Sequence, residues 1–74
     1  MILVIKGMRK VAANEVILSD GTLLCPGIVE ITRGFVSKTY LLEEEEARTE
    51  WLGGSIEIRL EGNNLKAYKN NKPI

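Results

Sequence analysis

The chain has 74 residues, of which ten are basic and ten acidic, so its formal net charge at neutral pH is zero. A chain of this length forms one small domain, which buries only about 60% of the surface that its unfolded form exposes. Zero net charge gives no general attraction to nucleic acid or to an acidic membrane surface. The absence of histidine removes the commonest general base and metal ligand. We therefore expect no enzyme activity, no metal and no cofactor.

Cysteine content restricts how so small a domain can be stabilised. Cys25 is the only cysteine, which excludes an internal disulfide and a cysteine-based metal cage. Unusually good packing or association remains, and we expect self-association, to at least a dimer. No histidine is present to activate the Cys25 thiol, so we interpret this residue as a buried structural cysteine rather than a nucleophile.

Residues 1–7 begin with five apolar residues, but the segment is too short for a signal peptide or a membrane span. With no targeting segment after them, we expect a cytoplasmic protein. Met8 is an alternative translation start. If residues 1–7 belong to the protein, they form an extra strand or an apolar N-terminal extension.

Strand and turn signals alternate through the first half of the chain. Arg9–Leu18 predicts a strand with a kink or bulge at Asn14. Ser19-Asp20-Gly21-Thr22 predicts a tight turn, because Asp and Gly tolerate positive φ. A short strand is expected over Thr22–Cys25, and Pro26-Gly27 is typical of a type II turn.

Two more strands are predicted before the middle of the chain. Ile28–Thr32 alternates in polarity, with Val29 and Ile31 on one face. Arg33-Gly34 then turns the chain into a longer strand, Phe35–Leu41.

Leu42–Arg48 is the only helix candidate. It contains four consecutive glutamates that repel one another, and about seven residues cannot hold a helix without tertiary support. We interpret the segment as a solvated turn of helix or a loop. Carboxylates can bind a divalent cation, but consecutive helical residues point in different directions, which favours a solvated acidic surface.

The clearest hairpin follows Gly53-Gly54. It consists of Ser55–Leu60, a turn at residues 61–64, and Leu65–Lys69. Strict alternation predicts that every second residue of this hairpin faces the core, namely Ile56, Ile58, Leu60, Leu65 and Ala67. Residues 70–74 are polar and are expected to be a frayed tail. Short strands with closely spaced turns predict one all-β domain over residues 1–74, a small sandwich or open barrel of antiparallel strands with at most one short helix.

Three aromatic residues are the candidate interface residues: Trp51, Tyr68 and Phe35. Tryptophan is enriched at binding hot spots, and Trp51 lies between an acidic segment and a Gly-Gly turn, where it can remain partly exposed. The competing interpretation is a residue that only closes one end of the core. A basic, aromatic segment at Lys66, Tyr68, Lys69 and Lys72 is the only sign of a nucleic-acid surface, and we expect no such partner.

The residues from Met8 to Lys38 resemble the start of amidohydrolase-superfamily enzymes. The likeness rests on Asp20-Gly21-Thr22, Pro26-Gly27-Ile28-Val29 and Arg33-Gly34-Phe35-Val36, the spacing of turns and strands. In that family this region builds a small β-sandwich, the composite domain, beside a metal-dependent catalytic barrel. Thr32 and Gly34 stand where the family's two metal-binding histidines would be, so the resemblance implies no metal site and no hydrolase activity.

The sequence thus predicts a non-catalytic structural or protein-interaction module that self-associates, a free-standing relative of a composite domain. Two alternatives remain open. The chain is an accessory or regulatory subunit that docks on a larger enzyme, or it is a small barrel that binds nucleic acid or another ligand through its lysine-rich terminal hairpin. We expect no association with a membrane.

Overall fold

The computed structural model describes residues 8–74, which form nine strands and no helix. The strands are β1 (Met8–Ala13), β2 (Glu15–Ile17), β3 (Leu23–Leu24), β4 (Gly27–Thr32), β5 (Phe35–Leu41), β6 (Glu50–Trp51), β7 (Ser55–Glu61), β8 (Asn64–Lys69) and β9 (Lys72–Pro73). The predicted all-β fold is confirmed. In this part of the chain there is no helix long and apolar enough to cross a membrane. The extra strand considered for residues 1–7 lies outside the described residues.

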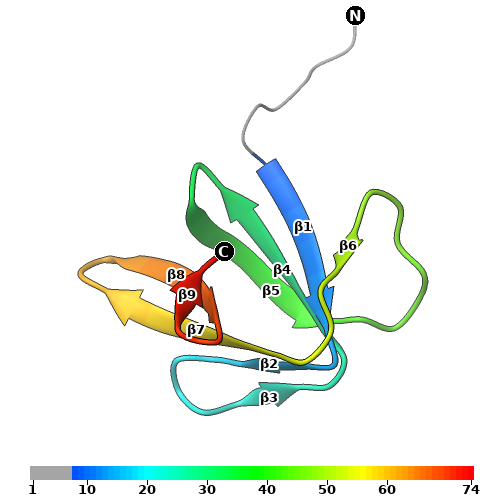
Figure 1. Cartoon of the computed structure of the whole chain (residues 1–74), viewed down its shortest axis with the longest axis horizontal. Helices are drawn as coiled ribbons and strands as arrows, with labels where there is room; N and C mark the ends of the chain where they lie inside the picture. Colours follow the sequence, from blue (N-terminus) through cyan, green and yellow to red (C-terminus); the bar gives the residue numbers. More distant parts are fainter. Residues whose placement is uncertain (1–7) are drawn as a thin grey trace, which may run out of the picture.

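The strands form two mixed sheets (Figure 1). The first sheet has the order β5-β4-β1-β6, and the second has the order β3-β2-β7-β8-β9. Most neighbouring strands are antiparallel, but β1 runs parallel to β6 and β2 runs parallel to β7. The expectation of antiparallel strands is therefore correct for the hairpins and wrong for these two pairs.

A double corner joins the two sheets. β1 leads into β2 and β6 leads into β7, so two neighbouring strands pass from the first sheet to the second side by side (Figure 1). The Asn14 side chain accepts a hydrogen bond of 2.8 Å from the Gly54 N–H, and the Glu15 N–H donates to the Gly54 carbonyl at 3.1 Å. Gly53 and Gly54 have φ values of +69° and +62°, which suit glycine because it lacks a Cβ. The predicted kink at Asn14 is confirmed, and a glycine bend in the partner strand matches it.

The main core lies between the two sheets and consists only of β-branched residues and alanine. Its members are Val11, Ala13, Val29 and Ile31 from the first sheet and Val16, Ile56, Ile58 and Ala67 from the second. β-branched side chains pack well on a pleated surface because they have few rotamers to lose. The predicted inward faces of β4 and of the start of β7 are thereby confirmed.

The predicted burial of Leu60 and Leu65, at the outer end of the β7–β8 hairpin, was wrong. Leu60 is 62% exposed, and Leu65 is only partly buried against the core. Alternation alone places both on the inner face, but β2 pairs with β7 only as far as Ile17 and Glu57. The tip of the β7–β8 hairpin extends beyond this point and has less of the molecule to pack against.

Gly27 also differs from the prediction. It is the first residue of β4 rather than part of a type II turn, and its φ is not positive. A Cβ at this position would lie 2.6 Å from Cγ2 of Val16. Glycine is needed here because β4 begins in close contact with β2, so the reason is steric and not conformational.

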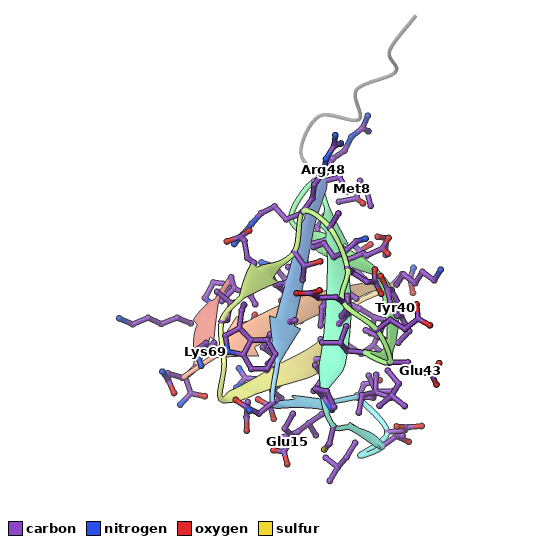
Figure 2. The ribbon with its side chains drawn as sticks, turned by 90° about the vertical axis from the view of Figure 1, so that its right-hand side faces the viewer. Met8, Glu15, Tyr40, Glu43, Arg48 and Lys69 are labelled. Atoms are coloured by element: carbon purple, nitrogen blue, oxygen red, sulfur yellow. The ribbon has the colours of Figure 1, made fainter. Side chains whose placement is uncertain are left out.

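Residues 42–49, which we call the strap, form a loop without helix. β5 and β6 are the two opposite edges of the first sheet, so the chain must cross that sheet to connect them. Figure 2 shows this segment passing in front of β1 and β4. The distance between the edges is three strand spacings, about 14 Å, whereas seven helical residues would span only about 10 Å. The loop interpretation is therefore confirmed, and a helix would be too short.

The C-terminal end is ordered, contrary to the prediction of a frayed tail. β9 pairs with β8 in the register Tyr68–Pro73 and Lys69–Lys72. Asn70 and Asn71 between them have φ values of 53° and 63°, the conformation of a type I′ turn, which asparagine tolerates. The paired asparagines, interpreted as part of a frayed tail, are a hairpin signal.

Candidate interaction surfaces

The three candidate interface residues do not lie together. Trp51 is on β6, at one edge of the first sheet, and Phe35 is on β5, at the opposite edge. Tyr68 is on β8, in the second sheet. The fold therefore contains no single aromatic patch, and each residue has to be judged by its own surroundings.

Trp51 is exposed but well placed at the double corner. Trp51 is 57% exposed, and within residues 8–74 β6 is hydrogen-bonded only to β1, so no other described strand lies on the other side of its backbone. The indole Nε1 lies near Gly53, since a Cβ added there would be 3.5 Å from it. Lys69 holds the same corner, donating a hydrogen bond of 3.0 Å from Nζ to the Gly53 carbonyl. This matches the expectation of a large side chain that remains partly exposed beside the Gly-Gly turn.

A two-point ion pair stands next to Trp51. Arg9 donates from Nε and Nη2 to the two carboxylate oxygens of Glu50, at 3.0 and 3.1 Å. The hydrogen bond from Arg9 holds the pKa of Glu50 below its ordinary value. Both side chains are about half exposed, so the ion pair contributes little to the stability of the fold.

Phe35 and Tyr68 are less suited to act as anchors. Phe35 is 41% exposed and directly follows the Arg33-Gly34 turn, whose φ values are 55° and 85°. Tyr68 lies under the Arg59 guanidinium, which is 4.2 Å from the centre of the ring, and its hydroxyl donates to the Glu61 carboxylate. That hydrogen bond raises the pKa of the Tyr68 hydroxyl. Tyr68 is thus engaged within its own sheet.

A polar cluster lies on the outer face of the first sheet, where the strap crosses it. The Tyr40 hydroxyl is 3.0 Å from Oε2 of Glu30 and 2.9 Å from Oε1 of Glu46. Lys10 donates to the same oxygen of Glu46 at 3.0 Å, and the Lys38 ammonium is 5.1 Å from the centre of the Tyr40 ring. The labelled Tyr40 side chain points toward the strap in Figure 2.

This cluster changes the interpretation of the acidic segment. Glu43, Glu44 and Glu45 are exposed, as expected for a solvated surface, but Glu46 is half-buried. Hydrogen bonds from Lys10 and Tyr40 lower the pKa of Glu46, and burial together with the two carboxylates raises that of Tyr40. Sequence reasoning missed this function of Glu46 because Lys10 is 36 positions away along the chain, and Tyr40, although only six positions away, is on the neighbouring strand β5.

The second sheet has a gap at its surface, which we call the notch: it lies between residues 17–21 and residues 57–60 and has a volume of about 590 Å³. It exists because β2 has three residues and β7 has seven. A smaller cavity of about 170 Å³ shares four lining residues with it and is lined by Leu18, Ser19, Asp20, Thr39, Ile58 and Leu65. Leu60, which is exposed, is one of the residues that line the notch.

Cys25 is exposed, so the prediction of a buried structural cysteine was wrong. Leu24, before it, packs against the core, and alternation then directs the next residue outward. Within residues 8–74 no group of three or more His, Cys, Asp or Glu side chains is arranged to hold a metal ion.

No protein-family model, curated protein or solved structure matches this chain. The resemblance of residues 8–38 to an amidohydrolase composite domain therefore stays a prediction.

Proposed function

We propose that the chain is a non-catalytic protein-interaction module that self-associates, with Trp51 as the main anchor. The observation that carries the proposal is the exposure of this side chain, 57%, on an edge strand that has a partner on one side only. Tryptophan is among the residues most enriched at binding hot spots. Its ring adds a large apolar contact at little cost in side-chain entropy.

The other sheet edges support this choice by being less suited to association. β3 and β9 have two residues each, and short edge strands discourage pairing with another chain. β5 is longer, but its register against β4 shifts between Glu30 and Ile31 and its outer side carries Lys38. Bulges and lysines are two means by which proteins protect an exposed edge.

Charge supports self-association as well. The ten basic and ten acidic residues cancel, so two copies of the chain do not repel each other through their net charge. The lysine-rich hairpin favours nucleic acid less than the sequence suggests, because the Lys69 ammonium is bound to the Gly53 carbonyl.

Light scattering coupled to size-exclusion chromatography tests the proposal. The wild-type chain of 8.2 kDa should run as at least a dimer at tens of micromolar, and Trp51→Ala should weaken the assembly by about thirtyfold or more, the effect of losing a hot spot of about 2 kcal/mol. Phe35→Ala is the matched control, because it removes an exposed aromatic residue from the opposite edge. A circular dichroism spectrum should show that both variants remain folded.

Two results would contradict the proposal. A wild-type chain that is monomeric at tens of micromolar has no self-association for Trp51 to mediate. A Trp51→Ala variant that is unfolded at every concentration would make Trp51 a core residue. Docking on a larger enzyme would use the same side chain, so binding of a purified partner to wild type and to Trp51→Ala distinguishes the accessory-subunit function.

A further inference from the structure

The notch is a place where the second sheet lacks part of a strand. The pairing of β2 with β7 ends at Ile17 and Glu57, yet β7 continues to Glu61. In a parallel pair, every second residue directs both its N–H and its C=O toward the same neighbour. The Gly54 carbonyl bonds to the Glu15 N–H in β2, so by alternation Leu60 directs its backbone groups to the same side, where β2 has ended.

The two sides of the notch have different chemistry. On the core side lie Leu60, which is 62% exposed, and the small cavity with Leu18 and Leu65. On the solvent side lie Glu57 and Arg59, which form an ion pair with each other. A strand that fills the notch must therefore have one apolar face and one face that accepts solvent and charge.

We propose that residues 2–6 of a second copy of this chain bind in the notch as an added strand. The proposal rests on the proposed self-association and names a second contact for it. Residues 1–6 are Met-Ile-Leu-Val-Ile-Lys, rich in the β-branched residues that favour strands. In a strand, Leu3 and Ile5 share one wholly apolar face with Met1, and the other face carries Ile2, Val4 and the charged Lys6, on the side where Glu57 lies. Addition of a strand to an open sheet edge is a common mode of peptide recognition.

Residues 2–6 cannot reach the notch of their own chain, because the linker between them and Met8 is too short. β1 and β2 run from Met8 to Ile17, about 30 Å of extended chain before the bend at the corner is taken into account. Figure 1 shows the start of β1 at the top of the molecule and the end of the β7–β8 hairpin at its left side. Only Gly7 would connect Met8 to a strand of residues 2–6, and one residue spans about 3.5 Å. The occupant must therefore come from another copy, and a reciprocal exchange between two copies gives a closed dimer.

The test compares the full chain with a chain that begins at Met8. The full chain should be a dimer, and removal of residues 1–7 should weaken dimerisation at least tenfold in light scattering and analytical ultracentrifugation. A synthetic peptide of residues 1–7, extended by two lysines for solubility, should bind to the shortened chain in isothermal titration calorimetry. Leu60→Glu in the shortened chain should weaken that binding at least tenfold. Leu23→Glu is the matched control, because Leu23 is 54% exposed and does not line the notch.

Each other outcome overturns the inference. If the shortened chain dimerises as strongly as the full chain, residues 1–7 do not join two copies. If the full chain is monomeric and the shortened chain binds the peptide, residues 2–6 reach the notch of their own chain and the linker is not too short. If the peptide fails to bind, or if Leu23→Glu and Leu60→Glu weaken binding equally, the notch is not the site. A dimer that is lost in Trp51→Ala and kept without residues 1–7 would overturn this inference and leave the proposed function intact.

Discussion

The two sheets differ in how their surfaces are completed. In the first sheet the strap covers the outer face, where Ile28 and Ala12 are 0% and 1% exposed although neither belongs to the main core. In the second sheet the connections β2–β3, β7–β8 and β8–β9 join neighbouring strands, so none of them crosses a face. The chain has apolar residues on an outer face where it supplies its own cover. Leu60, on the inner face of the second sheet beside the notch, is 62% exposed and has no such cover within residues 8–74, and this contrast is the reason for expecting another chain there.

The largest predicted effect is the difference in stability lost when a residue under the strap or a residue at the notch is truncated to alanine. Ile28→Ala should lower the free energy of unfolding by about 2–5 kcal/mol, because it opens a cavity in a fully buried site. Leu60→Ala should change it by no more than about 0.5 kcal/mol, because the side chain it removes is 62% exposed. Urea denaturation of the two variants, at a concentration where the chain is monomeric, measures the difference.

The control for this comparison is Ile56→Ala, which is fully buried in the main core. If the strap makes the outer face as well packed as the core, Ile28→Ala and Ile56→Ala should be similarly destabilising. A loss at Ile28 as small as the loss at Leu60 would mean that the strap covers the sheet without packing on it.

Local patterns predicted most of the strands, whereas the pairing of distant strands could not be predicted. The hairpins are specified by neighbouring residues: the Arg33-Gly34 turn has the positive φ values that glycine favours, and Phe35–Leu41 is observed with its predicted bounds. Parallel pairing of β1 with β6 and of β2 with β7 joins residues about 40 positions apart. No turn sequence marks such a pairing, and the alternating pattern of a strand does not indicate which other strand lies beside it.

The candidate sites depended on those distant pairings. The exposure of Trp51 could be expected from its glycine neighbours, but the notch arises only because the short β2 lies beside the long β7. Likewise, Glu46 is 36 positions from Lys10, so the acidic run alone could not identify its one half-buried member. The run of four glutamates correctly indicated a mostly solvated segment, but it did not indicate that Glu46 is the member bound by Lys10 and Tyr40.

A smaller effect should distinguish the two tyrosine contacts. Tyr40→Phe removes a hydroxyl that lies between Glu30 and Glu46 in a half-buried site. The free energy of unfolding should therefore fall by about 1 kcal/mol. Tyr68→Phe removes a hydroxyl whose bond to Glu61 is exposed, and its effect on thermal unfolding should be within error. Equal losses in the two variants would show that the cluster under the strap is as solvated as the open face of the second sheet.

The smallest effect concerns the pH dependence of the strap. The pKa of Glu46 is lowered in the folded chain because Lys10 and Tyr40 donate hydrogen bonds to its carboxylate. A carboxyl group whose pKa is lower in the folded than in the unfolded state stabilises the fold above the unfolded value, and the stabilisation disappears as pH falls through the folded value. Glu46→Gln should therefore make the decline in thermal stability below about pH 5 shallower, although Glu50, whose pKa Arg9 lowers, continues to contribute. Glu44→Gln, an exposed residue of the same strap, removes an equal charge and should leave the slope unchanged. If both variants decline as steeply as the wild type, the contact of Glu46 with Lys10 and Tyr40 does not hold the strap in solution.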